Sequence, residues 1–395
     1  MAEAFLRFVF WPTMTSLIHW SPNNYKFFTK WRQLMKALVV DGINDYSVQE
    51  VGFSEPKTGE VLIKMKATGV CHSDLSIING TIPMAAPVIV GHEGAGIVES
   101  VGENVTNVKP GDHVALTWVP ICGECYFCQH QEPYLCSAGS MAMGKQLDGT
   151  SRISRGDTPV NVMTLLGAMA EYAVVPSISL VKIEEDIPFA VAAMVGCGVM
   201  TGVGAAIKTA EVKPGSTVAV FGCGGVGLSV VQGARLAGAK TIIAVDLSQN
   251  KVDLALEFGA THGITSKDAV DEIKKLTGGI GVDYSFEVVG IPALVTAADM
   301  STRRGGTVTV VGVGKLTEFV NINSMMFSLS AKTYKGCFYG NANPAVDFPN
   351  LLSLYKQKRL PLDDMITKTY DIDDAPKAFE DMEAGLNARG IIIYD

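Results

Sequence analysis

The sequence lacks the excess of positive charge that a protein needs to bind nucleic acid or an anionic membrane. Its 395 residues carry 32 Lys and Arg against 40 Asp and Glu, which gives a net charge of −8. A basic face is the usual electrostatic footprint of such partners. We therefore expect neither nucleic acid nor a membrane as partner, and any phosphate group must be held by local structure.

Long hydrophobic runs are also scarce. The longest uncharged stretch, 187–207, is long enough to span a bilayer, but it contains Pro188 and four glycines. We interpret it as buried chain of a soluble protein. Internal repeats with a period of 20 to 50 residues and low-complexity tracts are absent as well, which excludes repeat architectures.

Cysteine is sparse, with eight residues in the chain. The apolar residues after Arg7 are not followed by a small-residue cleavage pattern, so we predict no secretory signal. In a reducing compartment, clustered cysteines point to metal binding or catalysis before disulfides. We therefore predict a cytoplasmic protein whose thiols bind metal.

The length of the chain predicts two domains. Residues 1–34 contain scattered aromatic side chains without a strand or helix period, and we interpret them as an accessory or disordered leader, with a transit peptide as the alternative. From Met35 to about Thr201, short strands separated by Gly and Pro predict a mostly β region. From Gly202 to Gly340, strands and helices alternate, which predicts a doubly wound parallel sheet.

A glycine-rich turn lies between a predicted strand at 217–221 and a predicted helix. This is the context that a dinucleotide-binding fingerprint requires. Glycines there make the tight turn, let a pyrophosphate approach the backbone and let the helix pack closely on the strand. The alternative is a glycine-rich turn in an unrelated α/β protein. The candidate residues are Gly222, Gly224, Gly225, Val226 and Gly227.

An acidic residue supports the dinucleotide interpretation. Asp246 follows the next predicted strand, 241–245, where a carboxylate can accept hydrogen bonds from both ribose hydroxyls. The same charge repels a 2′-phosphate, so NAD is favoured over NADP. Lys251 is placed to reach the same ribose, with a solvated surface lysine as the alternative.

Four cysteines are spaced Cys-x2-Cys-x2-Cys-x7-Cys, a clustering that thiolates use to close a tetrahedral zinc site. An iron–sulfur cluster is the main rival, but the fourth spacing does not fit a ferredoxin pattern. With all four positions filled, such a zinc ion is structural and has no open position for chemistry. The four residues are Cys122, Cys125, Cys128 and Cys136.

A second set is spread more widely, with Cys71, His92 and Cys197 each beside glycine-rich sequence. Two thiolates and one imidazole leave a fourth position open, which suits a catalytic zinc ion. Taken singly, a Cys or His is more often a packed core residue. These three residues alone leave both interpretations open.

The order of these motifs resembles that of the medium-chain zinc alcohol dehydrogenases. Segment 91–98, the four-cysteine loop and segment 222–227 occur in the family's order, and the likeness runs from about Met35 to Asp395. It implies a GroES-like, mostly β catalytic domain (35–201 and 341–395) and a Rossmann coenzyme domain (202–340), an α/β fold overall.

Two segments resemble the longer-loop branch of the family, typified by animal and plant enzymes. These are 148–152 and 196–202. Members of that branch are commonly dimers, so the resemblance implies a homo-oligomer, with a tetramer as the alternative to a dimer.

The resemblance also assigns roles around the metal. It implies that Cys71, His92 and Cys197 bind a catalytic zinc ion, that Asp74 orients His92, and that Glu93 lies behind the metal as an exchangeable ligand. For both acids a surface or helix-capping role is the alternative.

A proton path follows from the same resemblance. Ser73 matches the hydroxyl that takes the alcohol proton in relatives, with a helix N-cap as the alternative. Several relatives place a histidine five residues after the first ligand, where this chain has Ser76. The far end of the proton path is therefore left open.

Four more residues match contact positions in the family. His72 and Arg389 resemble pyrophosphate contacts, with ordinary surface charges as the alternative. Thr201 resembles a residue on the nicotinamide side, or it caps a helix. Trp118 matches a pocket wall and predicts small or slender alcohols.

These observations predict a zinc-dependent oxidoreductase that transfers a hydride between a small alcohol and NAD, giving an aldehyde or ketone, with two zinc ions per chain. The glutathione-dependent formaldehyde dehydrogenases resemble the chain in their zinc loops, so oxidation of an S-(hydroxymethyl)thiol is the enzymatic alternative. Those relatives, however, carry an arginine where this chain has Gly139 and an acid near Ile82. Polyol oxidation also stays open. A non-catalytic zinc- and nucleotide-binding sensor or scaffold is the alternative of another class.

Overall fold

The computed structural model of the chain describes residues 33–140, 144–386 and 388–395. The predicted leader, 1–34, lies almost entirely outside the described residues. The first described strand, β1 (Gln33–Gly42), begins two residues before the predicted start at Met35.

Strand β1 separates two hydrophobic cores, because successive side chains of a strand point to opposite faces. Met35, Ala37 and Val39 are buried in one core, while Leu38 and Val40 are buried in another. Most residues of the first core lie on five strands that close into a barrel: β1, β2 (Asp45–Phe53), β7 (Ile153–Arg155), β8 (Thr158–Val162) and β4 (Val88–Ile89).

A seven-stranded sheet packs beside this barrel, with β3 (Glu60–Gly69) pairing with three other strands. The C-terminal tail returns to this sheet, since Ile391 pairs with Gly69 and Ile393 with Ala67. This pairing is what the predicted assignment of 341–395 to the first domain requires. The other strands are β5 (Gly94–Val101), β6 (His113–Leu116), β9 (Tyr172–Pro176), β10 (Leu180–Lys182), β17 (Lys368–Tyr370) and β18 (Gly390–Ile393).

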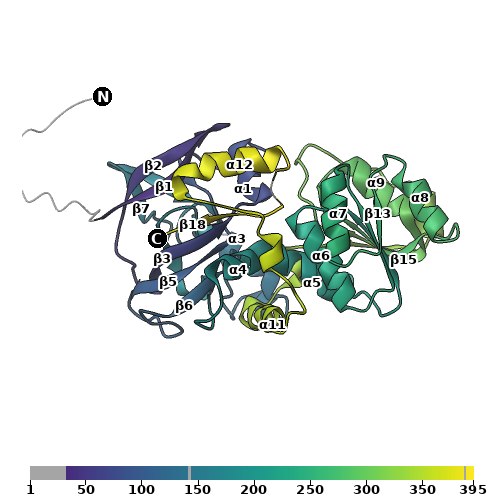
Figure 1. Cartoon of the computed structure of the whole chain (residues 1–395). Helices are drawn as coiled ribbons and strands as arrows, with labels where there is room; N and C mark the ends of the chain where they lie inside the picture. The colour runs from purple at the N-terminus through teal and green to yellow at the C-terminus, as the bar shows by residue number, and fades with distance from the viewer. Residues whose placement is uncertain (1–32, 141–143, 387) are drawn as a thin grey trace, which may run out of the picture. The chain divides into compact units, whose positions relative to one another are not determined.

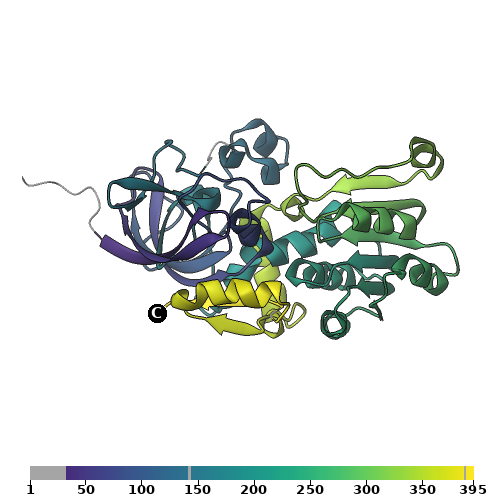
Figure 2. The same ribbon diagram turned by 90° about the horizontal axis from the view of Figure 1, so that it is seen from above.

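The third sheet has six parallel strands in the order β13-β12-β11-β14-β15-β16. This is the Rossmann order 3-2-1-4-5-6, and Figures 1 and 2 show helices covering both of its faces. The doubly wound prediction is therefore correct. The strands are β11 (Thr217–Phe221), β12 (Thr241–Val245), β13 (His262–Ile264), β14 (Val282–Glu287), β15 (Thr302–Val310) and β16 (Thr333–Gly336).

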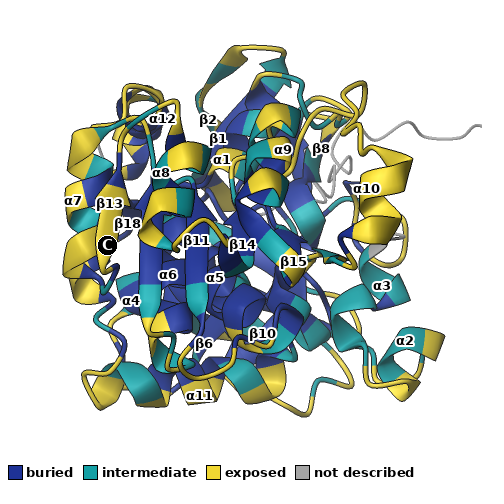
Figure 3. Cartoon of the chain, turned by 90° about the vertical axis from the view of Figure 1, so that its right-hand side faces the viewer, coloured by how far each residue is buried: buried dark blue, intermediate teal, exposed yellow. Residues whose placement is uncertain are grey.

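Apart from the run described in the next paragraph, the helices of the described residues are short. They are α1 (His72–Ile78), α2 (Tyr126–Gln129), α3 (Ser137–Ser140), α6 (Gly225–Leu236), α7 (Gln249–Glu257), α8 (Ala269–Leu276), α9 (Pro292–Ser301), α10 (Ser324–Leu329), α11 (Pro344–Lys356) and α12 (Ala375–Glu383). Figure 3 shows buried strands at the centre of the parallel sheet and mainly exposed residues on α10.

One long helical run crosses from the β region into the Rossmann region. It comprises α4 (Phe189–Met194), a π-helical turn (Val195–Val199), α5 (Met200–Gly204) and a second π-helical turn (Ala205–Thr209). By length and composition it could cross a membrane, but 83% of its most apolar window is buried inside the protein. The interpretation as buried chain is thus correct, whereas the mostly β prediction up to Thr201 missed this helix.

The physical reason for that miss is the composition of the run. Its residues are apolar or small on every side, so the sequence has no polar face and no helical period for a pattern to reveal. A helix that is hydrophobic all round is typical of a buried position.

Helix α12 is held to the seven-stranded sheet by a network around Asp381. Its Oδ2 accepts hydrogen bonds from Lys368 Nζ (2.6 Å) and Tyr370 Oη (2.8 Å), and Lys377 lies 3.0 Å from Oδ1. The bond from Lys368, with those from Lys377 and Tyr370, lowers the pKa of Asp381 well below its usual range.

We predict that Asp381→Asn lowers the melting temperature at pH 7, because the stabilised negative charge is lost. A depressed carboxyl pKa contributes stability that is complete above the unfolded-state pKa of about 4 and is lost as the pH falls further. The difference from wild type should therefore narrow below pH 4 in thermal melts. The exposed Asp364→Asn is the control, and an unchanged difference at all pH values contradicts the prediction.

Candidate active site

Asp74 joins the two segments that carry the first two predicted metal ligands. It lies in the first turn of α1 with a fully buried side chain. One carboxylate oxygen accepts from the backbone N–H of Cys71 (3.2 Å), and the other accepts from that of Gly91 (2.8 Å) and lies 3.0 Å from His92 Nδ1. A buried carboxylate with three partners fixes both segments, and the bond to Nδ1 turns Nε2 toward the other ligands.

Four donor atoms converge beyond this carboxylate. One atom each from Cys71, His92, Glu93 and Cys197 lies within 4.8 Å of the others, and all four residues are buried. His92 Nε2 has no hydrogen-bond partner among the described residues although it is buried. An orphaned buried nitrogen facing two thiols and a carboxylate fits a metal ligand, since buried polar atoms otherwise find partners.

The ionisable groups of this cluster shift one another's pKa values. The bond from the Cys197 thiol lowers the pKa of Cys71 well below its usual range, and the same bond raises the pKa of Cys197. Burial lowers the pKa of His92, but Asp74 and Cys71 outweigh burial and raise it overall. A metal ion that binds here displaces protons, because its ligands must be deprotonated.

Glu93 and Arg389 form a buried ion pair behind the cluster. Burial raises the pKa of Glu93 to about 7, against the opposing charge of Arg389. The Arg389 stem lies so close to Gly225 that a Cβ at this glycine would overlap it. Arg389 therefore reaches from the metal cluster to the glycine loop, so its predicted surface alternative is wrong.

The glycine loop opens α6 directly after β11, as the fingerprint requires. Asp246 Oδ2 accepts from the backbone N–H of Cys223 (2.9 Å), so the predicted ribose carboxylate lies against the loop. A Cβ at Gly227 would overlap the carbonyl oxygen of Gly222, whereas a Cβ at Gly224 would meet nothing within 4 Å. The last glycine thus serves packing, and Gly224 leaves open space for a ligand. Val226, between them, packs partly buried against the adjacent core.

His72 and Lys251 lie near the same loop. Desolvation lowers the pKa of His72, and the positive charges of Lys251 and Arg389 contribute to the lowering. Lys251 and Arg389 therefore create a positive potential where an anionic phosphate would bind, whereas the lowered pKa of His72 favours its neutral form.

The helix-capping alternatives for Ser73 and Thr201 are wrong. Ser73 is not a helix N-cap, because Cys71 occupies that position, and Ser73 Oγ instead lies 3.9 Å from Cys71 Sγ. Thr201 does not cap a helix, because it lies within the helical run that continues to Thr209.

Trp118 stands beside His92, with ring centroids 6.5 Å apart and an interplanar angle of 86°. Two further aromatic rings pack on it, Phe338 at 5.1 Å and Tyr339 at 4.6 Å. The latter two had no signal in the sequence, because they follow the unpredicted strand β16 and no motif contains them.

The four-cysteine loop forms a second cluster that includes α2. The Sγ–Sγ distances are 4.0 Å for Cys122–Cys128, 3.9 Å for Cys125–Cys136 and 3.5 Å for Cys122–Cys136. Tetrahedral zinc with Zn–S bonds of about 2.3 Å separates sulfurs by about 3.8 Å, so one ion fits. All eight cysteines are free, which makes the disulfide alternative wrong.

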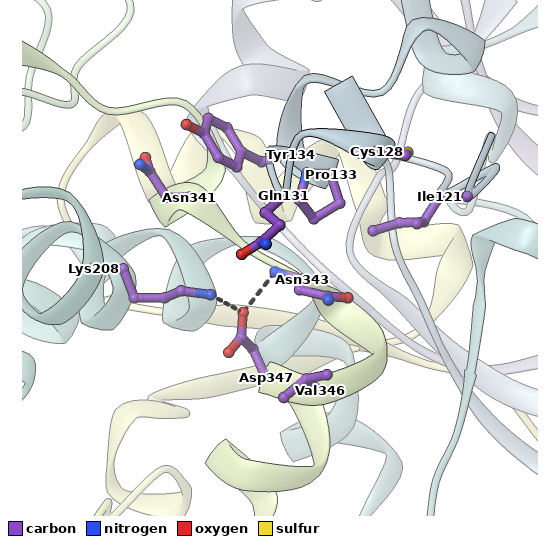
Figure 4. Close-up of a pocket in the computed structure, with 11 residues that line it drawn as sticks. Ile121, Cys128, Gln131, Pro133, Tyr134, Lys208, Asn341, Asn343, Val346 and Asp347 are labelled. Carbon is purple, nitrogen blue, oxygen red and sulfur yellow. Dashed lines mark hydrogen bonds and ion pairs between the residues drawn. The ribbon is translucent and has the colours of Figure 1, made fainter. Parts of the chain in front are cut away.

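A pocket of about 580 Å³ lies beside this cysteine loop (Figure 4). Cys128 and Tyr134 line one side, and on the other Asp347 accepts from Lys208 Nζ (2.5 Å) and from the backbone of Asn343 (2.6 Å). None of the residues of the Cys71 cluster lines it. Its ion pair is internally satisfied, so the pocket adds nothing to the candidate active site.

Comparison with known families identifies both parts of the chain. The profile "Alcohol dehydrogenase GroES-like domain" matches residues 57–185, and "Zinc-binding dehydrogenase" matches 225–357. Alcohol dehydrogenase B of Mycobacterium tuberculosis is 42% identical over 91% of this chain and 97% of its own length. The chain belongs to the zinc-dependent alcohol dehydrogenase family.

Other relatives of this dehydrogenase agree. An NDMA-dependent alcohol dehydrogenase of Amycolatopsis methanolica is 40% identical over 88% of this chain and 95% of its own length. The crystal structure of benzyl alcohol dehydrogenase from Acinetobacter calcoaceticus matches with a TM-score of 0.87 and 32% identity over 92% of this chain and the whole of the other. These matches confirm the predicted GroES-like and Rossmann fold. The relatives named here are bacterial, so the animal- and plant-like branch stays a prediction.

We predict that alanine substitution destabilises the glycine loop at Gly227, where the backbone is closely packed, but not at Gly224, where space is open. Gly227→Ala should lower the unfolding free energy of the dehydrogenase by about 1–3 kcal/mol, the usual effect of forcing extra atoms into packed structure. Gly224→Ala should leave it within about 0.5 kcal/mol, because its φ of −74° suits alanine and its Cβ meets no atom. Denaturant unfolding of both variants checks this, and equal losses contradict it.

Proposed function

We propose that this dehydrogenase transfers a hydride between a small alcohol and NAD, forming an aldehyde or ketone, with one catalytic and one structural zinc ion per chain. The observation that carries the proposal is the convergence of Cys71, His92 and Cys197 at a buried site that Arg389 links to the glycine loop. An open metal position beside a coenzyme loop is what hydride transfer from an alcohol requires.

The donor sets support both metals. Cys71, His92 and Cys197 would hold the catalytic ion and leave one position for substrate, with Glu93 as an exchangeable fourth ligand. When bound by these residues, a zinc ion would supply Lewis-acid chemistry that lowers the pKa of an alcohol. The four loop cysteines would hold the structural ion, and their sulfur separations favour one ion over the iron–sulfur alternative.

Three side chains of the protein would orient a metal ligand, accept a proton and limit the size of the substrate. Asp74 holds His92 in the orientation that presents Nε2. Ser73 Oγ lies 3.9 Å from Cys71 Sγ, and we propose that it takes the proton of the alcohol. Trp118 narrows the space beside His92 and admits small or slender alcohols, including a flat aromatic one.

We propose NAD as the coenzyme because Asp246 places its charge at the loop, where it would repel a 2′-phosphate. Gly222, Gly224, Gly225 and the N-terminus of α6 would bind the pyrophosphate, with Arg389 supplying positive charge and His72 donating a hydrogen bond from its ring. Lys251 and Thr201 would contact the ribose and the nicotinamide side. Two relatives make the acceptor worth testing, since a Sinorhizobium meliloti dehydrogenase with 28% identity was solved with NADP and another relative is named for NDMA.

A homodimer is the proposed assembly. The helix α10 and the segment before it expose a run of large apolar side chains beside β16, the edge strand of the parallel sheet. An apolar patch of this kind is typical of a protein–protein contact. The side chains are Leu316, Phe319, Met325, Met326, Phe327 and Leu329.

A cytoplasmic location is also proposed. The free thiols agree with a cytoplasmic location.

We predict two zinc ions per wild-type chain by metal analysis and formation of NADH with short-chain and benzyl alcohols. Cys71→Ala should retain one zinc ion and lose essentially all activity, because the open site is destroyed. Cys125→Ala should lose the other zinc ion and destabilise the fold. Cys337→Ser is the matched control and should keep both ions and the activity.

The substrate panel separates the alternatives. Activity with hydroxymethyl thiols alone selects the S-(hydroxymethyl)thiol reaction, and turnover only with NDMA excludes free NAD as acceptor. Nucleotide and zinc binding without turnover of any alcohol or polyol selects the sensor interpretation and overturns the proposal.

We predict that Asp246→Asn raises kcat/KM with NADP relative to NAD by about tenfold, the factor that corresponds to about 1.4 kcal/mol. Removal of one negative charge at the ribose favours the 2′-phosphate. Asp253→Asn, an exposed acid on the following helix α7, is the control and should leave the ratio unchanged. A ratio that does not move with Asp246→Asn shows that coenzyme selection lies elsewhere.

A further inference from the structure

The third predicted zinc ligand, Cys197, lies in a backbone segment of unusual geometry. It occupies the middle of the π-helical turn Val195–Val199, between α4 and α5. Single π-helical turns inside α-helices often lie at functional sites, because they change the direction of one side chain. A Cβ at Gly196 would lie 2.8 Å from the carbonyl oxygen of Leu116, so this turn is pressed against β6.

The peptide groups on both sides of Cys197 are held by side chains from distant parts of the chain. After Cys197, the backbone N–H of Gly198 donates to Glu93 Oε1 (3.1 Å). Before it, the carbonyl oxygen of Gly196 accepts from Tyr339 Oη (2.5 Å). Cys197 is therefore bracketed by two buried hydrogen bonds, and the Tyr339 hydroxyl supplies the one nearer the N-terminus of the helix.

Tyr339 itself lies in strained backbone. It lies in a tight turn, Tyr339–Asn341, in which Tyr339, Gly340 and Asn341 have φ values of 55°, 64° and 53°. Non-glycine residues are uncommon in this region, and they cluster at functional sites. A Cβ at Gly340 would lie 2.5 Å from the carbonyl oxygen of Met200, which shows how closely the turn approaches α5.

Side-chain contacts hold the turn in this place. Asn341 Oδ1 accepts from Thr209 Oγ1 (2.9 Å) at the end of the same helical run. The Tyr339 ring is buried against Trp118, and its hydroxyl lies 3.1 Å from Thr117 Oγ1 on the other side. A rigid, buried hydroxyl aimed at one carbonyl is suited to orienting the residue that follows that carbonyl.

We propose that Tyr339 is a positioning residue for the catalytic metal: its hydroxyl, bound to the Gly196 carbonyl, fixes the helical turn that directs the Cys197 sulfur at the ion. This inference rests on the proposed function, because it assumes that Cys71, His92 and Cys197 share one ion. It adds a residue that no metal-ligand spacing marks and that does not touch the metal.

The test uses Tyr339→Phe, which removes one oxygen and keeps the ring against Trp118. The full-length protein is prepared with zinc in the four-cysteine loop and cobalt(II) at the Cys71 site. The dissociation constant for cobalt is measured by competition with a chelator, and the thiolate-to-cobalt bands are recorded. Loss of an indirect partner typically weakens metal binding 10- to 100-fold, so we expect that weakening together with shifted bands.

The matched control is Tyr394→Phe. Tyr394 is also buried, and its hydroxyl also donates to a backbone carbonyl, that of Ala168 (3.3 Å). Removal of a buried hydroxyl should lower the melting temperature by a similar amount in both variants, so the loss of stability does not distinguish them. Only Tyr339→Phe should change cobalt affinity and spectrum, while Tyr394→Phe stays within twofold of wild type.

Several outcomes overturn the inference. Wild-type affinity and bands in Tyr339→Phe do so directly, as does an equal loss of affinity in Tyr394→Phe. If Tyr339→Phe does not fold, Thr117→Val removes the hydroxyl beside Tyr339 Oη, and it should weaken cobalt binding in the same direction but less. An unchanged constant in that variant also contradicts the role. A wild-type protein that binds no cobalt at this site instead refutes the proposed function, and this inference with it.

Discussion

The candidate site depends first on one buried carboxylate. Asp74 accepts hydrogen bonds from the backbone of Cys71 and of Gly91 and orients His92, so a single side chain sets the separation of two ligand-bearing segments. These segments follow β3 and precede β5, which pair side by side in the sheet. The sheet brings the segments together, and the carboxylate fixes their register to within a hydrogen-bond length. The other contacts of the candidate metal site depend on the positions of these two segments.

Local motifs were the part of the molecule that the sequence predicted best. The glycine loop, β11, α6 and Asp246 lie within one βαβ unit. The strand, turn, helix and acid that the fingerprint requires are therefore close together in the sequence. The cysteine loop was equally readable, because its spacing alone brings four sulfurs together. Edge strands such as β13 and β16 were missed, because three or four residues carry too little pattern.

Long-range features were harder to predict for a physical reason. Cys71 and Cys197 are joined by the fold and not by spacing, so only the family resemblance proposed their meeting. The helical run around Cys197 shows no period because it has no polar face. Tyr339 and the reach of Arg389 to Gly225 depend on which side chains pack together after folding, and no single segment records that.

The helical run from Phe189 to Thr209 has a consequence for how the two regions can change over time. It carries Cys197 near its middle, and further along, Gly202 packs so tightly on α6 that a Cβ there would overlap Ser229. One helical run thus contributes to the candidate metal site and packs on the Rossmann region. A coenzyme domain exchanged at this boundary would therefore need a helical run that fits both regions, because the same run packs on α6 and carries Cys197.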